Sequence, residues 1–171
     1  MHNSQLADPL NQFARAMKQV SSKRTKTEAD YEELARLEFR GGLYMTAEGP
    51  VLPGEALEAA IIQAAKKRKR GPQAKAAVIV PNHAALEYEG PRDVDGLWGD
   101  PDFRLVAPVV VSRARVMRTR PRFKSWGATV TIDFEDGQLN RSEVVDFVHI
   151  AGQLIGIGDW RPRYGRFVAE F

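Results

Sequence analysis

The sequence contains no cysteine and only three histidines. Without cysteine the chain can form neither a disulfide nor a thiolate metal site, which agrees with a reducing compartment. No pair of histidines has a metal-ligand spacing such as His-x-x-x-His, so we expect no structural zinc site. We predict no metal and no other cofactor.

Long apolar segments are also missing. No run approaches the roughly 20 residues needed to span a bilayer, and the N-terminus lacks the apolar core of a signal peptide. The chain has 171 residues, of which 43% are hydrophobic and 27% charged, ordinary values for a globular protein. We therefore predict one cytoplasmic domain with no membrane partner.

Basic residues are concentrated in three segments, although the formal net charge is only +3. Residues 112–124 carry six basic side chains and no acidic one, residues 66–70 are KKRKR, and residues 161–166 (RPRYGR) contain three arginines. Acidic residues gather in 28–38 and 87–102. This segregation predicts a basic face, which is the usual electrostatic footprint of a polyanionic partner.

The N-terminal segment, residues 1–41, predicts two helices. Asp8-Pro9 has the pattern of an N-cap followed by proline, and it should begin a helix that runs to about residue 20. Thr27 and Asp30 have the spacing of a capping box for a second helix, which should end at Gly41-Gly42. Met1–Ser4 resembles the end of a preceding element, so either the natural start lies upstream or the first edge of the fold is degenerate.

Residues 42–171 predict the core of the protein. A hairpin over 42–52, turning at 48–50, should precede a helix that begins at Pro53-Gly54 and stops at Gly71-Pro72. Later elements are a strand over 76–80, a loop-rich insertion over 81–105, strands over 106–120 and 127–134, a helix capped by Asn140 and Glu143, and a closing strand over 164–171. This order predicts an α+β, ferredoxin-like antiparallel sheet with helices on one face.

Alternate residues of an extended strand project from the same face, so the basic residues of 109–124 should form two sets. The sets are Arg118, Arg120, Arg122 and Lys124, and Arg113 and Arg115. The second set has the opposite parity, so either the strand is bulged or the two sets face different surroundings. Because acidic residues are absent locally, the pattern favours binding to nucleic acid; the alternative is a solvated strand face paired with acids of a neighbour.

Two further basic segments have a functional and a structural interpretation. The first is the predicted helix end, Lys66, Lys67, Arg68, Lys69 and Arg70, which either contacts phosphates or simply complements the helix dipole. The second is the loop IGIGDWRPRYGRF at 155–167, where glycines permit positive φ, arginines supply cations and aromatic rings could stack on bases. Its candidate residues are Gly156, Gly158, Trp160, Arg161, Arg163, Tyr164, Gly165 and Arg166; the alternative is a glycine-rich connection with aromatics packed in the core.

Two motifs resemble those of the RAMP superfamily of CRISPR systems. Pro53, Gly54 and Leu57 match the "Pro-Gly-small-x-Leu" helix start, and Gly156, Gly158, Gly165 and Arg166 match a C-terminal glycine-rich loop. The nearest resemblance is to effector backbone subunits and small phage-borne relatives. It implies an RNA-recognition-motif-like fold, a bacterial or phage-infected cell, and sequence-independent binding of a single strand by neighbouring copies.

Three hypotheses remain. The leading one is a non-catalytic protein that coats single-stranded RNA or DNA, as a homo-oligomer or with other subunits. The second is an endoribonuclease of the same fold, for which His2, His83 and Asp8 are the candidates; His149 falls in an apolar helix, where we expect a buried structural side chain. The third is a protein–protein module, an assembly subunit or inhibitor of a nucleic-acid machine, in which the acidic segment 87–102 could contact the basic face of a neighbouring copy.

Overall fold

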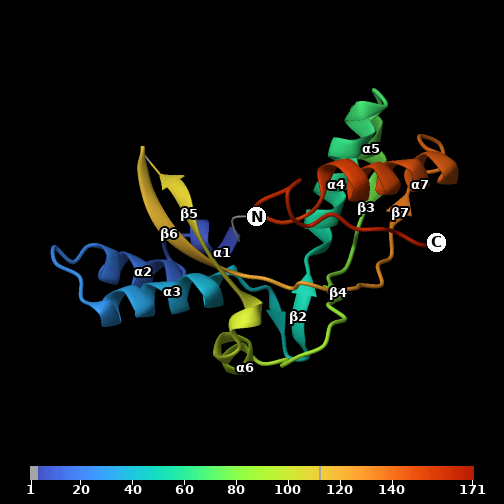
Figure 1. Ribbon diagram of the computed structural model, residues 1–171. Helices are drawn as coiled ribbons and strands as arrows, with labels where there is room; N and C mark the ends of the chain where they lie inside the picture. Colours follow the sequence, from blue (N-terminus) through green and yellow to red (C-terminus); the bar gives the residue numbers. More distant parts are fainter. Residues whose placement is uncertain (1–3, 112) are drawn as a thin grey trace. The chain divides into compact units, whose positions relative to one another are not determined.

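The computed structural model describes residues 4–111 and 113–171 (Figure 1). The chain forms two compact units, each built from two separate stretches of sequence. The α4–α7 unit comprises Val51–Ala85 and Ala128–Phe171. The hairpin unit comprises the described residues up to Pro50 together with Leu86–Gly127.

The hairpin unit combines helices with a long two-stranded ribbon. Its elements are α1 (Ser4–Ala7), α2 (Gln12–Ser21), α3 (Glu28–Gly42), β1 (Met45–Thr46), the start of β2 (Gly49–Leu52), α6 (Val94–Gly99), a 3-10 turn (Pro101–Phe103), β5 (Arg104–Val111) and β6 (Ala114–Pro121). Its core contains the fully buried Phe39 and Leu97. The rings of Tyr88, Phe103 and Phe123 pack edge to face around them, with centroids 4.8–5.7 Å apart.

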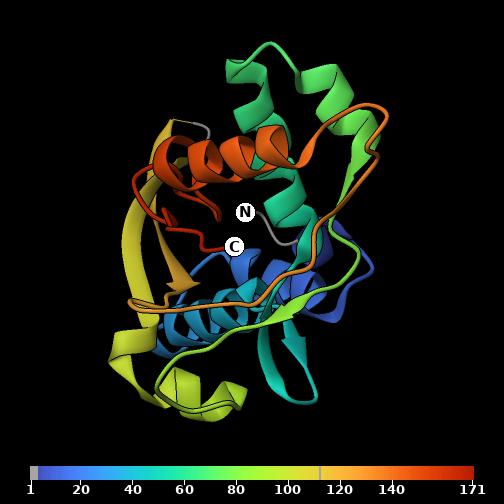
Figure 2. The ribbon, with the colours of Figure 1, turned by 90° about the vertical axis from the view of Figure 1, so that its right-hand side faces the viewer.

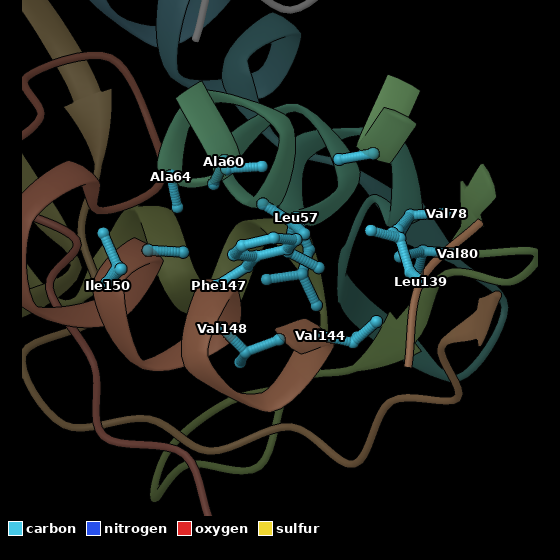
Figure 3. Close-up of a cluster of buried hydrophobic side chains, with 14 of the residues drawn as sticks. Leu57, Ala60, Ala64, Val78, Val80, Leu139, Val144, Phe147, Val148 and Ile150 are labelled. Carbon is cyan, nitrogen blue, oxygen red and sulfur yellow. The ribbon is translucent and has the colours of Figure 1, made fainter. Parts of the chain in front are cut away.

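The α4–α7 unit has the larger core. Its elements are α4 (Gly54–Lys67), α5 (Gly71–Ala77), β3 (Val78–Ile79), β4 (Ala84–Ala85), β7 (Asp133–Phe134), α7 (Arg141–Ile150) and a π-helical turn (Ala151–Ile155). Phe147 of α7 lies beside Leu57 of α4 in the middle of the cluster (Figure 3). The first residue of α4 is Gly54. A Cβ at this position would lie 2.4 Å from the carbonyl oxygen of Val80, so a larger residue would clash. This close approach gives the Pro53-Gly54 helix start a packing reason.

The α+β class is confirmed, but the ferredoxin-like sheet is not. The described strands form three small antiparallel sheets, with strand orders β1-β2-β4, β3-β7 and β5-β6. Outside β5 and β6, the strands are two to four residues long. Helices rather than a continuous sheet therefore supply most of the buried apolar residues of the larger core.

Both predicted capping boxes are confirmed. The side chain of Thr27 accepts from the backbone N–H of Asp30, and that of Asn140 accepts from the N–H of Glu143, with the reciprocal bonds also present. The hairpin within 42–52 is also present, because Thr46 pairs with Gly49 across a tight turn. These elements depend on interactions between residues close together in the sequence.

Six predicted elements or boundaries are wrong, and three of them lie before residue 81. Asn11 caps α2, because the carboxylate of Asp8 accepts from the backbone N–H of Leu10 at 2.8 Å and holds a turn instead. Pro72 lies in the first turn of α5 rather than ending structure, since proline is tolerated where no backbone donor is required. The predicted strand over 76–80 accordingly shrinks to Val78–Ile79.

The remaining three errors concern predicted strands later in the chain. Residues 106–120 are not one strand but the β5–β6 hairpin (Figure 1, Figure 2), and its turn includes Arg113, whose φ is 70°. Of 127–134, Gly127 bridges Glu87 and only Asp133–Phe134 forms a strand. The C-terminal stretch 164–171 forms no strand, although the backbone N–H of Phe167 donates to Gly152 at 3.2 Å.

No helix in the described part of the chain has the length and apolar character needed to cross a membrane. Within residues 4–111 and 113–171, no group of three or more histidine and acidic side chains is placed to hold a metal ion.

Candidate nucleic-acid interface

The basic cluster at the end of α4 divides into two groups. Arg68 binds Asp146 of α7 through two hydrogen bonds of 2.8 and 3.1 Å, and this contact lowers the pKa of the Asp146 carboxyl. Arg70 forms an ion pair with Glu143, at 3.1 Å, and donates to the carbonyl of Gln138. These two arginines hold α4 against α7 and the turn that precedes it.

The three lysines of the cluster do not connect α4 to α7. Lys66, Lys67 and Lys69 are exposed, and within the described residues none of them has an acidic partner. Two of them lie in the last turn of α4, where positive charge complements the helix dipole. That complementarity leaves their ammonium groups in solvent, where they can still bind an anion.

The glycine-rich loop has the backbone conformation that the sequence predicts. Gly156, Gly158 and Gly165 have φ values of 72°, 89° and 74°, a region that side chains disfavour. Gly165 also approaches Ile157 so closely that a Cβ would lie 1.7 Å from its carbonyl oxygen. The N–H of Ile157 donates to the carbonyl of Gly165 at 2.9 Å, which closes the loop on itself.

Two aromatic rings stack at the outer part of this loop. The rings of Trp160 and Tyr164 lie 6.0 Å apart, nearly parallel, and the guanidinium of Arg163 lies 5.8 Å from the Tyr164 centroid. The Tyr164 side chain is exposed rather than part of either core. The alternative in which both aromatics pack in the core is therefore not the arrangement found.

The loop arginines are held by backbone carbonyls and not by acids. Arg161 donates to Gly158 at 3.1 Å, and Arg166 donates to Pro162 at 2.9 Å. Arg161, Arg163 and Arg166 are all exposed, and none has an acidic partner in the described part of the chain. A neutral carbonyl orients a guanidinium without cancelling its charge, so these groups keep their capacity to bind phosphate.

Two of the four cations in the larger hairpin set pair with acids, contrary to the open basic face expected from parity. Arg118 pairs with Glu38 of α3, whose carboxylate also accepts from the backbone N–H of Thr119 at 2.9 Å. Lys124 pairs with Asp102 at 2.7 Å, and Arg122 donates to the carbonyl of that residue. Arg120 also has an interaction partner. The neutralising acids come from distant parts of the sequence, which the local absence of acids did not reveal.

Glu38 is the one residue of this network that the sequence could have indicated. It follows Leu34 by four positions and Tyr31 by seven, so it continues the predicted apolar stripe of α3. An acid at such a position is buried only with a partner, and Glu38 is 3% exposed. Its position in the stripe is thus a signal for a buried ion pair.

Arg113 and Arg115, the set of opposite parity, face different surroundings. Both are exposed at the turn end of the hairpin, and neither has an acidic partner among the described residues. The structure therefore separates the basic residues of 109–124 into a group with partners inside the protein and a solvent-facing pair at the turn.

The candidate catalytic residues that the structure describes each have a local structural contact. His83 is exposed, and its Nδ1 accepts from the N–H of Gly54 at 3.3 Å, which caps the start of α4. His149 was expected to be buried but is exposed, because it lies outside the inward stripe of α7, and its ring contacts Phe171. Asp8 holds its turn, and His2 lies outside the described residues.

Several acidic side chains of the segment 87–102 cap helices or form ion pairs. Asp93 caps α6 and Asp100 caps the following 3-10 turn, in agreement with the turn interpretation of this segment. Asp95 pairs with Arg36 and Arg40 of α3, and the Arg36 and Arg40 hydrogen bonds lower its pKa.

Comparison of the chain with family models, with curated proteins and with solved structures gave no match in any of the three. The resemblance to RAMP proteins therefore rests on the two short motifs alone.

Proposed function

We propose that this protein binds single-stranded RNA or DNA through its phosphate backbone, without catalysing a reaction on it. The observation that carries the proposal is the set of exposed cations without acidic partners in the α4–α7 unit. The proposal uses six members of that set, from the end of α4 and the glycine-rich loop: Lys66, Lys67, Lys69, Arg161, Arg163 and Arg166.

Exposed cations alone would serve for any polyanion, and the stacked pair Trp160–Tyr164 favours a single strand. Bases of a single strand are free to stack on aromatic rings, and each such contact contributes about 1–3 kcal/mol without regard to sequence. Because the two rings already face each other, a base would stack on an outer face. Binding should therefore depend on backbone charge and strandedness much more than on base identity.

The paired cations have a different role in this proposal. Arg68, Arg70, Arg118 and Lys124 maintain the fold through their acidic partners, so they contribute little free charge. The RAMP resemblance, with its glycine-rich loop on the same residues, agrees with the proposal and adds the expectation of several copies on one strand.

Fluorescence anisotropy with labelled oligo(U), oligo(dT) and a duplex of equal length tests the proposal. We expect both single strands to bind more tightly than the duplex at low salt, and replacement of Trp160 with alanine to weaken single-strand binding about tenfold, as the loss of one stacking contact implies. Equal affinity for all three ligands would reject the single-strand assignment, and no binding at low salt would reject the function.

A further inference from the structure

The turn end of the β5–β6 hairpin exposes apolar side chains beside its two free arginines. Val110 and Met117 are 70% and 59% exposed, and Val111 is 44% exposed. Cross-strand partners share a face of the ribbon; Val110 is opposite Arg115 in the register, and the next pair on that face is Pro108 with Met117. We call Val110, Val111, Arg113, Arg115 and Met117 the hairpin tip.

A surface of opposite charge lies on α3 of the same unit. Tyr31 and Glu32 lie three and four residues after Glu28, which places all three on one side of the helix. Tyr31 is 62% exposed, and in the described residues neither glutamate has a basic partner. Like charges four residues apart on a helix repel each other, so a cation of a second copy would relieve the repulsion between Glu28 and Glu32. We call these three residues the α3 acidic surface.

We propose that the hairpin tip of one copy docks on the α3 acidic surface of a second copy. Arg113 and Arg115 would pair with Glu28 and Glu32, while Val110 and Met117 would cover the ring of Tyr31. Although α3 packs against β6, no hydrogen bond, ion pair or ring contact joins these two surfaces within one chain over the described residues. The inference does not depend on nucleic acid, because it uses neither the lysines of α4 nor the glycine-rich loop.

The hairpin tip and the α3 acidic surface have opposite charge, and both expose apolar side chains. These two properties favour a second copy of the chain as the docking partner. The hairpin tip offers two cations beside exposed aliphatic groups, and the α3 acidic surface offers two anions beside an exposed aromatic ring. The tip cannot pair with itself, because it has one sign of charge, so the contact joins two different surfaces. Such head-to-tail contacts produce rings or open chains rather than closed dimers.

The acidic segment 87–102 is the less suitable partner for a neighbouring basic surface. Asp95 and Asp102 already pair with arginines and a lysine of their own copy, and Asp93 and Asp100 are caps. Docking on that segment would break these bonds, whereas docking on Glu28 and Glu32 breaks none.

A pair of charge reversals tests the proposal with protein freed of nucleic acid. One variant carries Arg113→Glu and Arg115→Glu, and the other carries Glu28→Lys and Glu32→Lys. We expect the wild type to assemble with rising concentration in sedimentation velocity, and each variant alone to remain monomeric. An equimolar mixture of the two should assemble again, because every contact in an alternating chain then joins opposite charges.

Reversal of Arg15 and Lys18, two exposed cations on α2, is the matched control and should leave assembly unchanged. Circular dichroism and the unfolding midpoint would establish that each variant is folded. A wild type that stays monomeric at high concentration and low salt would overturn the proposal. Assembly of either reversed variant alone, or failure of the mixture to assemble, would do the same. Oligonucleotide binding is measured separately, so a failure of assembly is distinguishable from a failure of the proposed function.

Discussion

Arg118 of β6 forms an ion pair with Glu38 of α3, which precedes it by 80 residues and is almost completely buried. The same carboxylate accepts the backbone N–H of Thr119. The pair therefore connects the β5–β6 hairpin to α3, the longest helix of its unit. Arg118 thus has a structural role rather than a place on an open binding face.

Replacement of Arg118 with alanine should strongly destabilise the hairpin unit. It would leave the Glu38 carboxylate buried without its cation, a loss of about 3 kcal/mol or more in the free energy of unfolding. Urea denaturation followed by circular dichroism measures the change. Arg115→Ala, on the same strand but exposed, should change the free energy by less than about 0.5 kcal/mol. Equal effects of the two substitutions would contradict the structural assignment of Arg118.

Asp30 should make stability fall in acid. The hydrogen bond from Lys23, followed by that from the backbone of Thr27, lowers the pKa of Asp30 from 3.8 to about 2. A carboxyl whose pKa is lower in the folded state stabilises the fold above its ordinary pKa, and this contribution is lost as the pH falls from about 4 to about 2. The difference in unfolding free energy between wild type and Asp30→Asn should thus be largest above pH 5 and shrink towards pH 2.

The control for this prediction is Lys23→Met, which removes the largest cause of the low pKa while leaving the capping box in place. In that background the pH dependence attributable to Asp30 should be weaker. A difference between wild type and Asp30→Asn that is constant from pH 2 to pH 6 would show that Asp30 does not titrate with folding.

The glycine-rich loop offers two substitutions with different expected severity. Gly165→Ala requires a Cβ 1.7 Å from the carbonyl oxygen of Ile157, so the loop cannot keep its conformation. Gly158→Ala meets no atom within 4 Å and incurs only the strain of its positive φ, about 1–2 kcal/mol. We expect Gly165→Ala to lower single-strand affinity at least tenfold and Gly158→Ala to lower it much less. The reverse order in an anisotropy titration would place the binding residues elsewhere.

The sequence predicted those elements whose determinants are local. The capping boxes at Thr27 and Asn140, the helix after Pro53-Gly54 and the positive φ of the loop glycines each depend on residues within a few positions. Such patterns include both the chemical groups and their geometry, so they predicted the structure correctly.

The errors arise where distant residues decide the outcome. The run of valines and arginines in 106–120 is typical of a strand, and only the fold shows that it turns near Arg113 and pairs with itself. The parity argument placed Arg118 in solvent because Glu38 is remote in sequence. For the candidate site, the residue types were visible in the sequence, but which cations have acidic partners was not.

The measurement that tests the central claim most directly is the salt dependence of oligo(U) binding to the wild type and to Lys66→Ala/Lys67→Ala/Lys69→Ala. Each phosphate contact on a single strand contributes about 0.7 to the slope of log Kobs against log salt concentration, so removal of three contacts should reduce the slope by about 2. Arg15→Ala/Lys18→Ala/Arg24→Ala removes the same charge from exposed positions outside the α4–α7 unit and should leave the slope nearly unchanged. A triple-lysine variant with the wild-type slope and affinity would contradict the account.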